Sequence, residues 1–260
     1  MTGPEPVPEP VHVTLPWRVL VVVPARNEEA TLGGCLASVD RAAARLRQSR
    51  PTVGLEVAVV LDSCTDRSAE ALARFPHVRC VPVDLRRVGA ARAAGVLAVR
   101  ADRGRTPHPT DRTWLASTDA DGEVPPDWLT SQLDRADRGA AAVLGMVQPQ
   151  RGLPEAVLAH WHAQHPARED HDHVHGANLG VRLDHYDHVG GFEPLEEHED
   201  VRLVERLVHS GVRVDRTSEA RVTTSSRRLG RTPGGFAGFL ALLQERTTEN
   251  LSEVSTRATG

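Results

Sequence analysis

Residues 114–129 read WLASTDADGEVPPDWL, a short apolar run followed by two acids and several turn residues. The run that begins at Trp114 indicates the end of a buried strand, and Gly122 and the prolines after it stop any regular element. Side chains alternate along an extended backbone, so Asp119 and Asp121 are expected on one side of the strand tip. Neighbouring carboxylates repel each other unless a cation or a hydrogen-bonding ligand lies between them. Asp and Gly are also ordinary turn residues, so an acidic turn is the alternative to a binding site at this point of the argument.

The composition is that of a globular protein with a substantial core. The chain has 260 residues, of which 40% are hydrophobic and 25% charged. A net charge of -4 argues against general nucleic-acid binding, because no excess of basic residues is present to neutralise phosphates. All 31 basic residues are arginine, so any phosphate contact must come from Arg, His or a backbone N–H.

The cysteines and the hydropathy predict a cytoplasmic protein without a membrane span. Cys35, Cys64 and Cys80 lack the spacing of a metal site and indicate a reducing compartment. Residues 1–16 are rich in proline and glutamate, which predicts a disordered lead instead of a signal peptide. No apolar run approaches the roughly 20 residues that cross a bilayer.

The first half of the chain alternates predicted strands with predicted helices. The β-branched run at residues 18–23 has the pattern of a strand buried on both faces of a parallel sheet. Asn27 is expected to cap the helix that follows, and no glycine lies between strand and helix, which excludes a P-loop or dinucleotide fingerprint. Further strands are predicted at residues 55–61 and 78–83. This alternation predicts an α/β sheet that binds ligands at the carboxyl ends of its strands, where Asp62 lies.

The second half is richer in histidine and less regular. An apolar strand is predicted at residues 140–147, and a histidine-rich segment follows it at residues 160–175. His173 and His175 alternate as in an extended chain and are expected to share a face. A helix is predicted over residues 201–208, with a short strand over residues 212–214.

Several segments together resemble the family 2 glycosyltransferases, inverting nucleotide-sugar transferases with the GT-A fold. The resemblance covers residues 19–214. VVVPARNEEATL at 21–32 resembles the opening strand and nucleotide loop, and VAVVLDSCTDRS at 57–68 resembles the second strand. TDAD at 118–121 resembles the DxD motif. HGANLGVR at 175–182, followed by VGGFEPL, resembles the acceptor segment, and EHED at 197–200 resembles the ED motif with the catalytic base.

The resemblance implies a single GT-A (Rossmann-like) α/β domain, with a mixed, mostly parallel sheet and helices on both faces. The domain is predicted over residues 17–222, with a nucleotide-binding half at 17–125 and an acceptor half at 126–222. Residues 223–260 are predicted to form a basic C-terminal segment with an amphipathic helix and a frayed tail.

The resemblance also implies a set of site residues. The residues expected to bind the nucleotide-sugar donor are Pro24, Ala25, Arg26, Glu28, Asp62, Arg92, Asp119, Ala120 and Asp121. Mg²⁺ or Mn²⁺ is expected at Asp121, with Asp119 on the ribose or on a metal-bound water and His175 as a further ligand. The acceptor side is expected to include Gly176, Ala177, Asn178 and Glu199, with Asp200 as the base. Arg227, Arg228 and Arg231 are predicted to clamp the diphosphate, and an exposed basic tail is the alternative.

The implied activity is transfer of a sugar from a nucleoside diphosphate to a soluble or lipid-linked small acceptor. A UDP-sugar is the expected donor, GDP-mannose comes next, and a homodimer is possible. Asp200 could instead be only a helix N-cap. Two further alternatives stay open, namely a catalytically silent nucleotide-binding module and a metal-dependent hydrolase built on residues 169–175.

Overall fold

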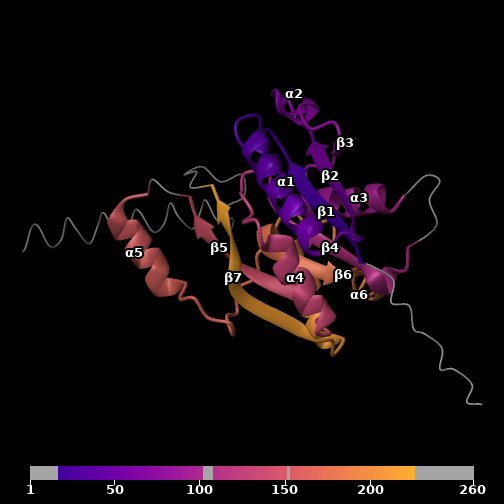
Figure 1. The fold of residues 1–260 in the computed structure, drawn as a ribbon. Helices are drawn as coiled ribbons and strands as arrows, with labels where there is room; N and C mark the ends of the chain where they lie inside the picture. Colours follow the sequence, from indigo (N-terminus) through magenta and orange to yellow (C-terminus); the bar gives the residue numbers. More distant parts are fainter. Residues whose placement is uncertain (1–16, 102–107, 151–152, 226–260) are drawn as a thin grey trace, which may run out of the picture.

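The computed structural model describes residues 17–101, 108–150 and 153–225 (Figure 1). The predicted disordered lead, the C-terminal amphipathic helix and the three clamp arginines lie outside these residues.

A seven-stranded sheet forms the centre of the described chain, in the order β3-β2-β1-β4-β6-β5-β7. The neighbours β3, β2, β1 and β4 run parallel, β6 is antiparallel to both β4 and β5, and β5 is parallel to β7. The predicted α/β class with a mixed, mostly parallel sheet is therefore confirmed. The strands are β1 (Arg18–Ala25), β2 (Gly54–Asp62), β3 (Arg79–Val83), β4 (Thr113–Ser117), β5 (Ala142–Pro149), β6 (Leu179–Arg182) and β7 (Val214–Thr224).

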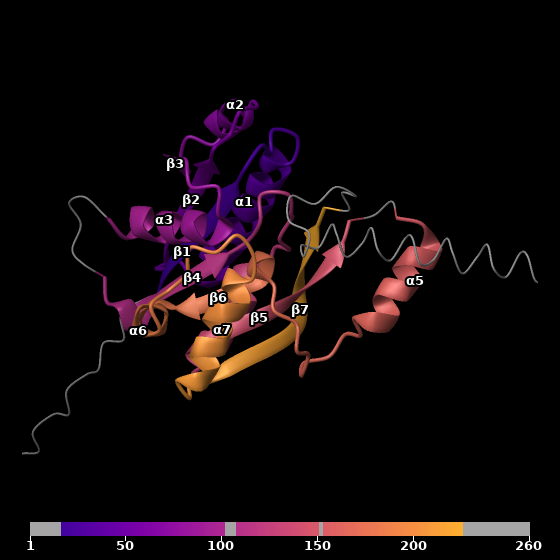
Figure 2. The ribbon, with the colours of Figure 1, turned by 180° about the vertical axis from the view of Figure 1, so that it is seen from behind.

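Helices cover both faces of the sheet. Figure 1 shows α1 and α4 on one face, and the view from behind in Figure 2 shows α3, α6 and α7 on the other. The helices are α1 (Leu32–Ser49), α2 (Ser68–Ala73), α3 (Val88–Arg100), α4 (Trp128–Asp137), α5 (Glu155–Gln164), α6 (Leu183–His188) and α7 (Glu199–His209). Two short 3₁₀ turns complete the described elements, η1 (Thr110–Arg112) and η2 (Gly176–Asn178).

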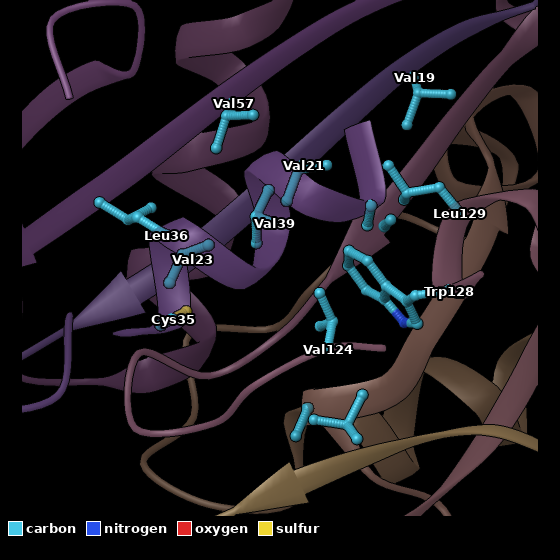
Figure 3. Close-up of a cluster of buried hydrophobic side chains, with 14 of the residues drawn as sticks. Val19, Val21, Val23, Cys35, Leu36, Val39, Val57, Val124, Trp128 and Leu129 are labelled. Atoms are coloured by element: carbon cyan, nitrogen blue, oxygen red, sulfur yellow. The ribbon is translucent and has the colours of Figure 1, made fainter. Parts of the chain in front are cut away.

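The β-branched run of β1 is explained by two separate cores. Val19, Val21 and Val23 point toward α1 and α4, where Trp128 is also buried (Figure 3). The residues between them, such as Leu20, point to the opposite core under α3 and α7. Because both faces are covered, the strand has no solvent side and carries no polar alternation.

The last strand is longer than predicted. Only residues 212–214 were expected to be extended, whereas β7 runs over Val214–Thr224 and pairs with β5, with a register shift between Gly145 and Val147. Its middle is polar and only partly buried, as at an edge of a sheet, so hydrophobic periodicity does not reveal it. The strand also continues past residue 222, while the predicted domain boundary itself stays a prediction.

A close contact between α3 and the sheet gives a test of this packing. A Cβ at Gly95 would lie 2.5 Å from Val22 Cγ1 and 2.9 Å from Val60 Cγ2. We expect Gly95→Ala to lower the free energy of unfolding by about 1–3 kcal/mol, because the overpacking outweighs the better helix propensity of alanine. Urea unfolding followed by circular dichroism measures this difference.

The matched control is Gly34→Ala in α1. A Cβ at Gly34 would meet only the carboxylate end of Glu123, at 3.4 Å. This variant should be as stable as the wild type or slightly more stable. Equal destabilisation by both substitutions would contradict the packing argument.

Candidate functional site

A cavity of about 450 Å³ opens at the carboxyl ends of β1, β2 and β4. Both halves of the chain contribute to its wall, as the sequence predicts. The predicted residues that line it are Pro24, Ala25, Arg26, Glu28, Asp62, Arg92, Asp119, Ala120, Asp121, His175, Gly176, Ala177, Glu199 and Asp200. Lining residues that the sequence analysis did not single out include Arg86, Arg87, Glu196, His198 and Thr224.

The loops after β1 and β2 are locked to each other at one end of the cavity. Asn27 has a positive φ of 54°, and its Oδ1 accepts the backbone N–H of Thr65 at 2.7 Å. Cys64 Sγ donates to the Ala25 carbonyl at 3.4 Å and accepts the Asn27 N–H at 3.4 Å. The prediction that Asn27 caps α1 is wrong, because its side chain bonds across to the second loop and α1 begins at Leu32.

Asp62 fixes the loop between β3 and α3. The residue is 4% exposed, and its Oδ1 accepts the backbone N–H groups of Leu85 at 2.7 Å and Arg86 at 2.9 Å. The Ser63 hydroxyl lies 3.0 Å from the same oxygen and 2.5 Å from Asp84 Oδ1, so its single hydrogen is shared between two carboxylates. These bonds fix the loop from which Arg86 and Arg87 line the cavity. Two consecutive arginines a few residues after the predicted strand at 78–83 are the sequence feature that could have indicated them.

The acid pair is tied to a buried arginine. Arg92 Nη2 donates to Asp119 Oδ1 at 2.5 Å, and Arg92 Nη1 donates to Glu199 Oε1 at 2.7 Å. Burial disfavours charge on Arg92, but the carboxylates of Asp119 and Glu199 more than offset it and raise the arginine pKa. Burial also raises the pKa of Glu199, against the opposing effect of Arg92. Arg92 was predicted to bind the nucleotide-sugar donor. In the structure its guanidinium donates to Asp119 and Glu199, one acid from each of the two acidic motifs.

Asp200 lies in the first turn of α7 and lines the cavity. Its Oδ2 accepts the Gly176 N–H at 2.6 Å, and its Oδ1 accepts the N–H of Val201 at 2.8 Å. The N-cap position belongs to His198, which has a positive φ of 64°. The alternative that Asp200 is only an N-cap is therefore wrong, since Asp200 contacts a separate segment of the cavity wall.

The histidines of the second half stack on one another. The rings of Trp161 and His165 are 3.5 Å apart and 8° from parallel, and His165 stacks on His173 at 4.7 Å. The His173 and His175 rings are 5.8 Å apart, which confirms that they share a face. Burial, with a smaller effect of the neighbouring histidines, lowers the pKa of His175 to about 3, so the ring that lines the cavity is neutral near pH 7.

The described residues do not contain a preformed metal centre. In residues 17–101, 108–150 and 153–225, no group of three or more His, Cys, Asp and Glu side chains could hold a metal ion. The hydrolase reading of residues 169–175 therefore lacks structural support. Asp119 and Asp121 both line the cavity, and the Asp119 side chain is 37% exposed. Two carboxylates fit a cation that takes its other ligands from a diphosphate and water.

Asn178 was predicted on the acceptor side but does not line the cavity. Its Oδ1 accepts Trp128 Nε1–H at 2.9 Å, and its Nδ2 donates to the carbonyls of Met146 at 2.9 Å and Ala220 at 3.1 Å. A Cβ at Gly145 would lie 2.1 Å from this Nδ2. Asn178 thus joins α4, β5 and β7 in the interior, because its amide satisfies buried polar groups there.

The sequence matches the family described as Glycosyl transferase family 2 over residues 20–186. This span is more than half of the 260 residues, so the chain belongs to glycosyl transferase family 2. Among curated proteins, none matches the sequence. Within the part of the chain that the structure describes, no helix is long and apolar enough to span a membrane.

Solved structures share the fold at low sequence identity. S. aureus TarS 1–349 in complex with UDP-GlcNAc is 14% identical with a TM-score of 0.59, over 84% of this chain and 61% of that one. The mannosyltransferase PcManGT from Pyrobaculum calidifontis, in complex with GDP-Man and Mn²⁺, is 20% identical with a TM-score of 0.58, over 84% of this chain and 59% of that one.

A third structure matches over more of its own length. Glucosyl-3-phosphoglycerate synthase from Mycobacterium tuberculosis, in complex with Mn²⁺, UDP and glucosyl-3-phosphoglycerate, is 16% identical with a TM-score of 0.53, over 90% of this chain and 78% of that one. This chain spans less than two thirds of the TarS fragment and of PcManGT. These likenesses confirm the GT-A fold.

The depressed pKa of His175 makes stability depend on pH in one direction. The unfolded chain takes up a proton near the ordinary histidine pKa of about 6.5, whereas folded His175 resists protonation down to about pH 3. Stability is therefore complete above about pH 6.5 and decreases as the pH falls toward 3. We expect a loss of about 2 kcal/mol between pH 7 and pH 5 from His175 alone.

Urea unfolding at the two pH values, with EDTA present to remove metal ions, measures this loss. His175→Gln should reduce the pH dependence by that amount, because glutamine does not titrate. The same pH dependence in wild type and His175→Gln would show that the ring is not shielded from protons.

Proposed function

We propose that this chain is an inverting glycosyltransferase that moves a sugar from a nucleoside diphosphate to an acceptor hydroxyl, with Asp200 as the general base. The observation that carries the proposal is that Asp119 and Asp121 line the same cavity as Asp200, from the opposite half of the chain. Inversion by a single displacement needs the donor phosphates and the base on opposite sides of the reacting carbon. A cavity with acids contributed by both halves suits that arrangement.

Asp200 is oriented to accept a proton from the acceptor. The Gly176 N–H holds Oδ2 and the Val201 N–H holds Oδ1, so the carboxylate has one preferred orientation at the cavity wall. A carboxylate suffices as the base if the hydroxyl loses its proton late, as its oxygen bonds to the sugar.

Asp121 and Asp119 are the residues that would hold Mg²⁺ or Mn²⁺. When bound, the cation would act as a Lewis acid on the leaving diphosphate. Asp119 Oδ1 already accepts from Arg92 at 2.5 Å, so we assign the direct metal contact to Asp121 and the ribose or a metal-bound water to Asp119. His175 lines the same cavity and stays only a predicted further ligand, because it forms no preformed three-residue metal group with the two acids in the described residues.

Asp62 favours a uracil-containing donor. Two backbone N–H groups donate to its Oδ1, which also lies 3.0 Å from the Ser63 hydroxyl. Oδ2 makes none of these bonds and can accept one N–H, which matches the single N3–H of uracil. Guanine offers two adjacent donors, which a carboxylate accepts best with both oxygens. We therefore place a UDP-sugar first and GDP-mannose second.

The remaining assignments are also proposals. The acceptor is a soluble or lipid-linked small molecule, with Gly176, Ala177 and Glu199 on its side of the cavity. The cytoplasmic location, the homodimer and the clamp role of Arg227, Arg228 and Arg231 stay predictions. The second candidate function is a nucleotide-binding module without transferase activity, and it differs from the first in the role of Asp200.

Nucleotide binding tests the donor site. We expect UDP to raise the melting temperature of the wild type in the presence of Mn²⁺ more than GDP does, with dTDP as the third nucleotide measured. Asp121→Ala should weaken Mn²⁺-dependent UDP binding about tenfold or more, because a metal ligand is lost. Asp127→Ala, an exposed acid six residues away that does not line the cavity, is the control and should bind as the wild type does. A wild type that binds none of the three nucleotides would contradict the donor-site assignment.

Replacement of the base tests the chemistry separately from binding. Asp200→Asn should lower kcat for sugar transfer on the order of 1,000-fold, as expected for loss of a general base. Its affinity for UDP and Mn²⁺ should stay close to that of the wild type. Glu205→Gln, an exposed acid on the same helix, serves as the control. Unchanged activity in Asp200→Asn would favour a different base, and absent activity in the wild type would favour the silent module.

A further inference from the structure

Arg92 connects three segments that are distant in sequence. It extends from α3 toward the loop after β4 and the first turn of α7, and donates to Asp119 at 2.5 Å and to Glu199 at 2.7 Å. The side chains of Arg92 and Glu199 are only 3% and 5% exposed. A charge so far from water is stable only while its partners stay in place. The two contacts therefore fix Asp119 relative to the start of α7.

Close packing encloses the guanidinium group. A Cβ at Gly176 would lie 1.7 Å from Arg92 Nη1, and the Phe192 ring lies under the guanidinium with its centroid 5.8 Å from Cζ. A Cβ at Gly89 would lie 1.9 Å from the carbonyl oxygen of Glu193. The helix that carries Arg92 and the loop before α7 thus approach each other as closely as glycine allows, and the guanidinium has little room to turn.

Arg92 and Gly176 both contact the first turn of α7, which contains the proposed base Asp200. Glu199 is bound directly by Arg92, and Asp200, the next residue, is bound by the N–H of Gly176 at 2.6 Å. Gly176 in turn packs on Arg92. A displacement of the guanidinium would therefore release Glu199 and shift the segment that orients Asp200.

We propose that Arg92 is a positioning residue that sets the distance between the acid pair and the base Asp200, and that it is not a ligand of the donor diphosphate. This inference rests on the proposed function for the roles of Asp119 and Asp200. Nη1 and Nη2 each donate to a carboxylate, Nε has no partner among the described residues, and the side chain is only 3% exposed, so the guanidinium links the two acids across the cavity wall. Occupation of the donor site is transmitted through this link to the first turn of α7.

Arg92→Lys and Glu199→Gln test the link from its two ends. Lysine keeps the charge but lacks the planar fork that holds two carboxylates at once. We expect each variant to bind UDP and Mn²⁺ within about threefold of the wild type and to lose about 100-fold in kcat, because misplacement by an ångström has an effect of that size. The double variant should lose little more than either single variant, since all three remove the same link.

Amide hydrogen exchange at residues 199–203 supplies a readout that needs no turnover. UDP with Mn²⁺ should protect these amides in the wild type and not in Arg92→Lys or Glu199→Gln. If Arg92→Lys does not fold, Glu199→Gln with the same two measurements decides the matter.

Three results would overturn the inference, and they differ from one another. A tenfold or larger loss of UDP affinity in Arg92→Lys, with Glu199→Gln unaffected, would make Arg92 a diphosphate ligand. Ligand-induced protection that persists in both variants would show that the link transmits nothing. A wild type that binds no nucleotide would overturn the proposed function and this inference with it.

Discussion

Burial of both faces of the sheet is the constraint on which the rest of the structure depends. Because α1 and α4 cover one face and α3 and α7 the other, β1 can be apolar from Val19 to Ala25. Parallel neighbours in such a sheet end at the same edge, and the polar residues that close each strand gather there. The cavity lies at that edge because it is where buried strands first meet water.

Charge then links the two halves across this edge. Asp119 follows a strand of the first half and Glu199 begins a helix of the second, yet one buried guanidinium contacts both. Glu199 is buried, and the guanidinium supplies the opposite charge that compensates its burial. The arrangement of the acids therefore depends on α3, an element that the acidic motifs do not include. Substitutions on α3 can therefore change the positions of these acids although the substituted residues contact no substrate.

The sequence predicted the place of a residue well where a local pattern of neighbouring residues determines it. It failed where contacts with residues distant in sequence determine it. The apolar run of β1 and the acids at strand ends predicted the α/β class and the place of Asp62, Asp119 and Asp121 at the cavity, and the family resemblance predicted the other lining residues that were named. The extent of β7 was missed because its middle residues are polar, and pairing with β5 alone defines the strand. Asn27 and Asn178 were misassigned because their partners, Thr65 and Met146, are 38 and 32 residues away.

The two outer strands of the described sheet have a consequence for folding in a crowded cell. An open edge offers unpaired backbone groups to any extended chain nearby. On β3, Pro82 removes one donor and Arg79 is exposed, while Asp215 on β7 pairs with Arg213 just before the strand. Charge and proline at these positions disfavour the addition of a further strand. These features of the described residues thus protect the sheet against edge-to-edge aggregation.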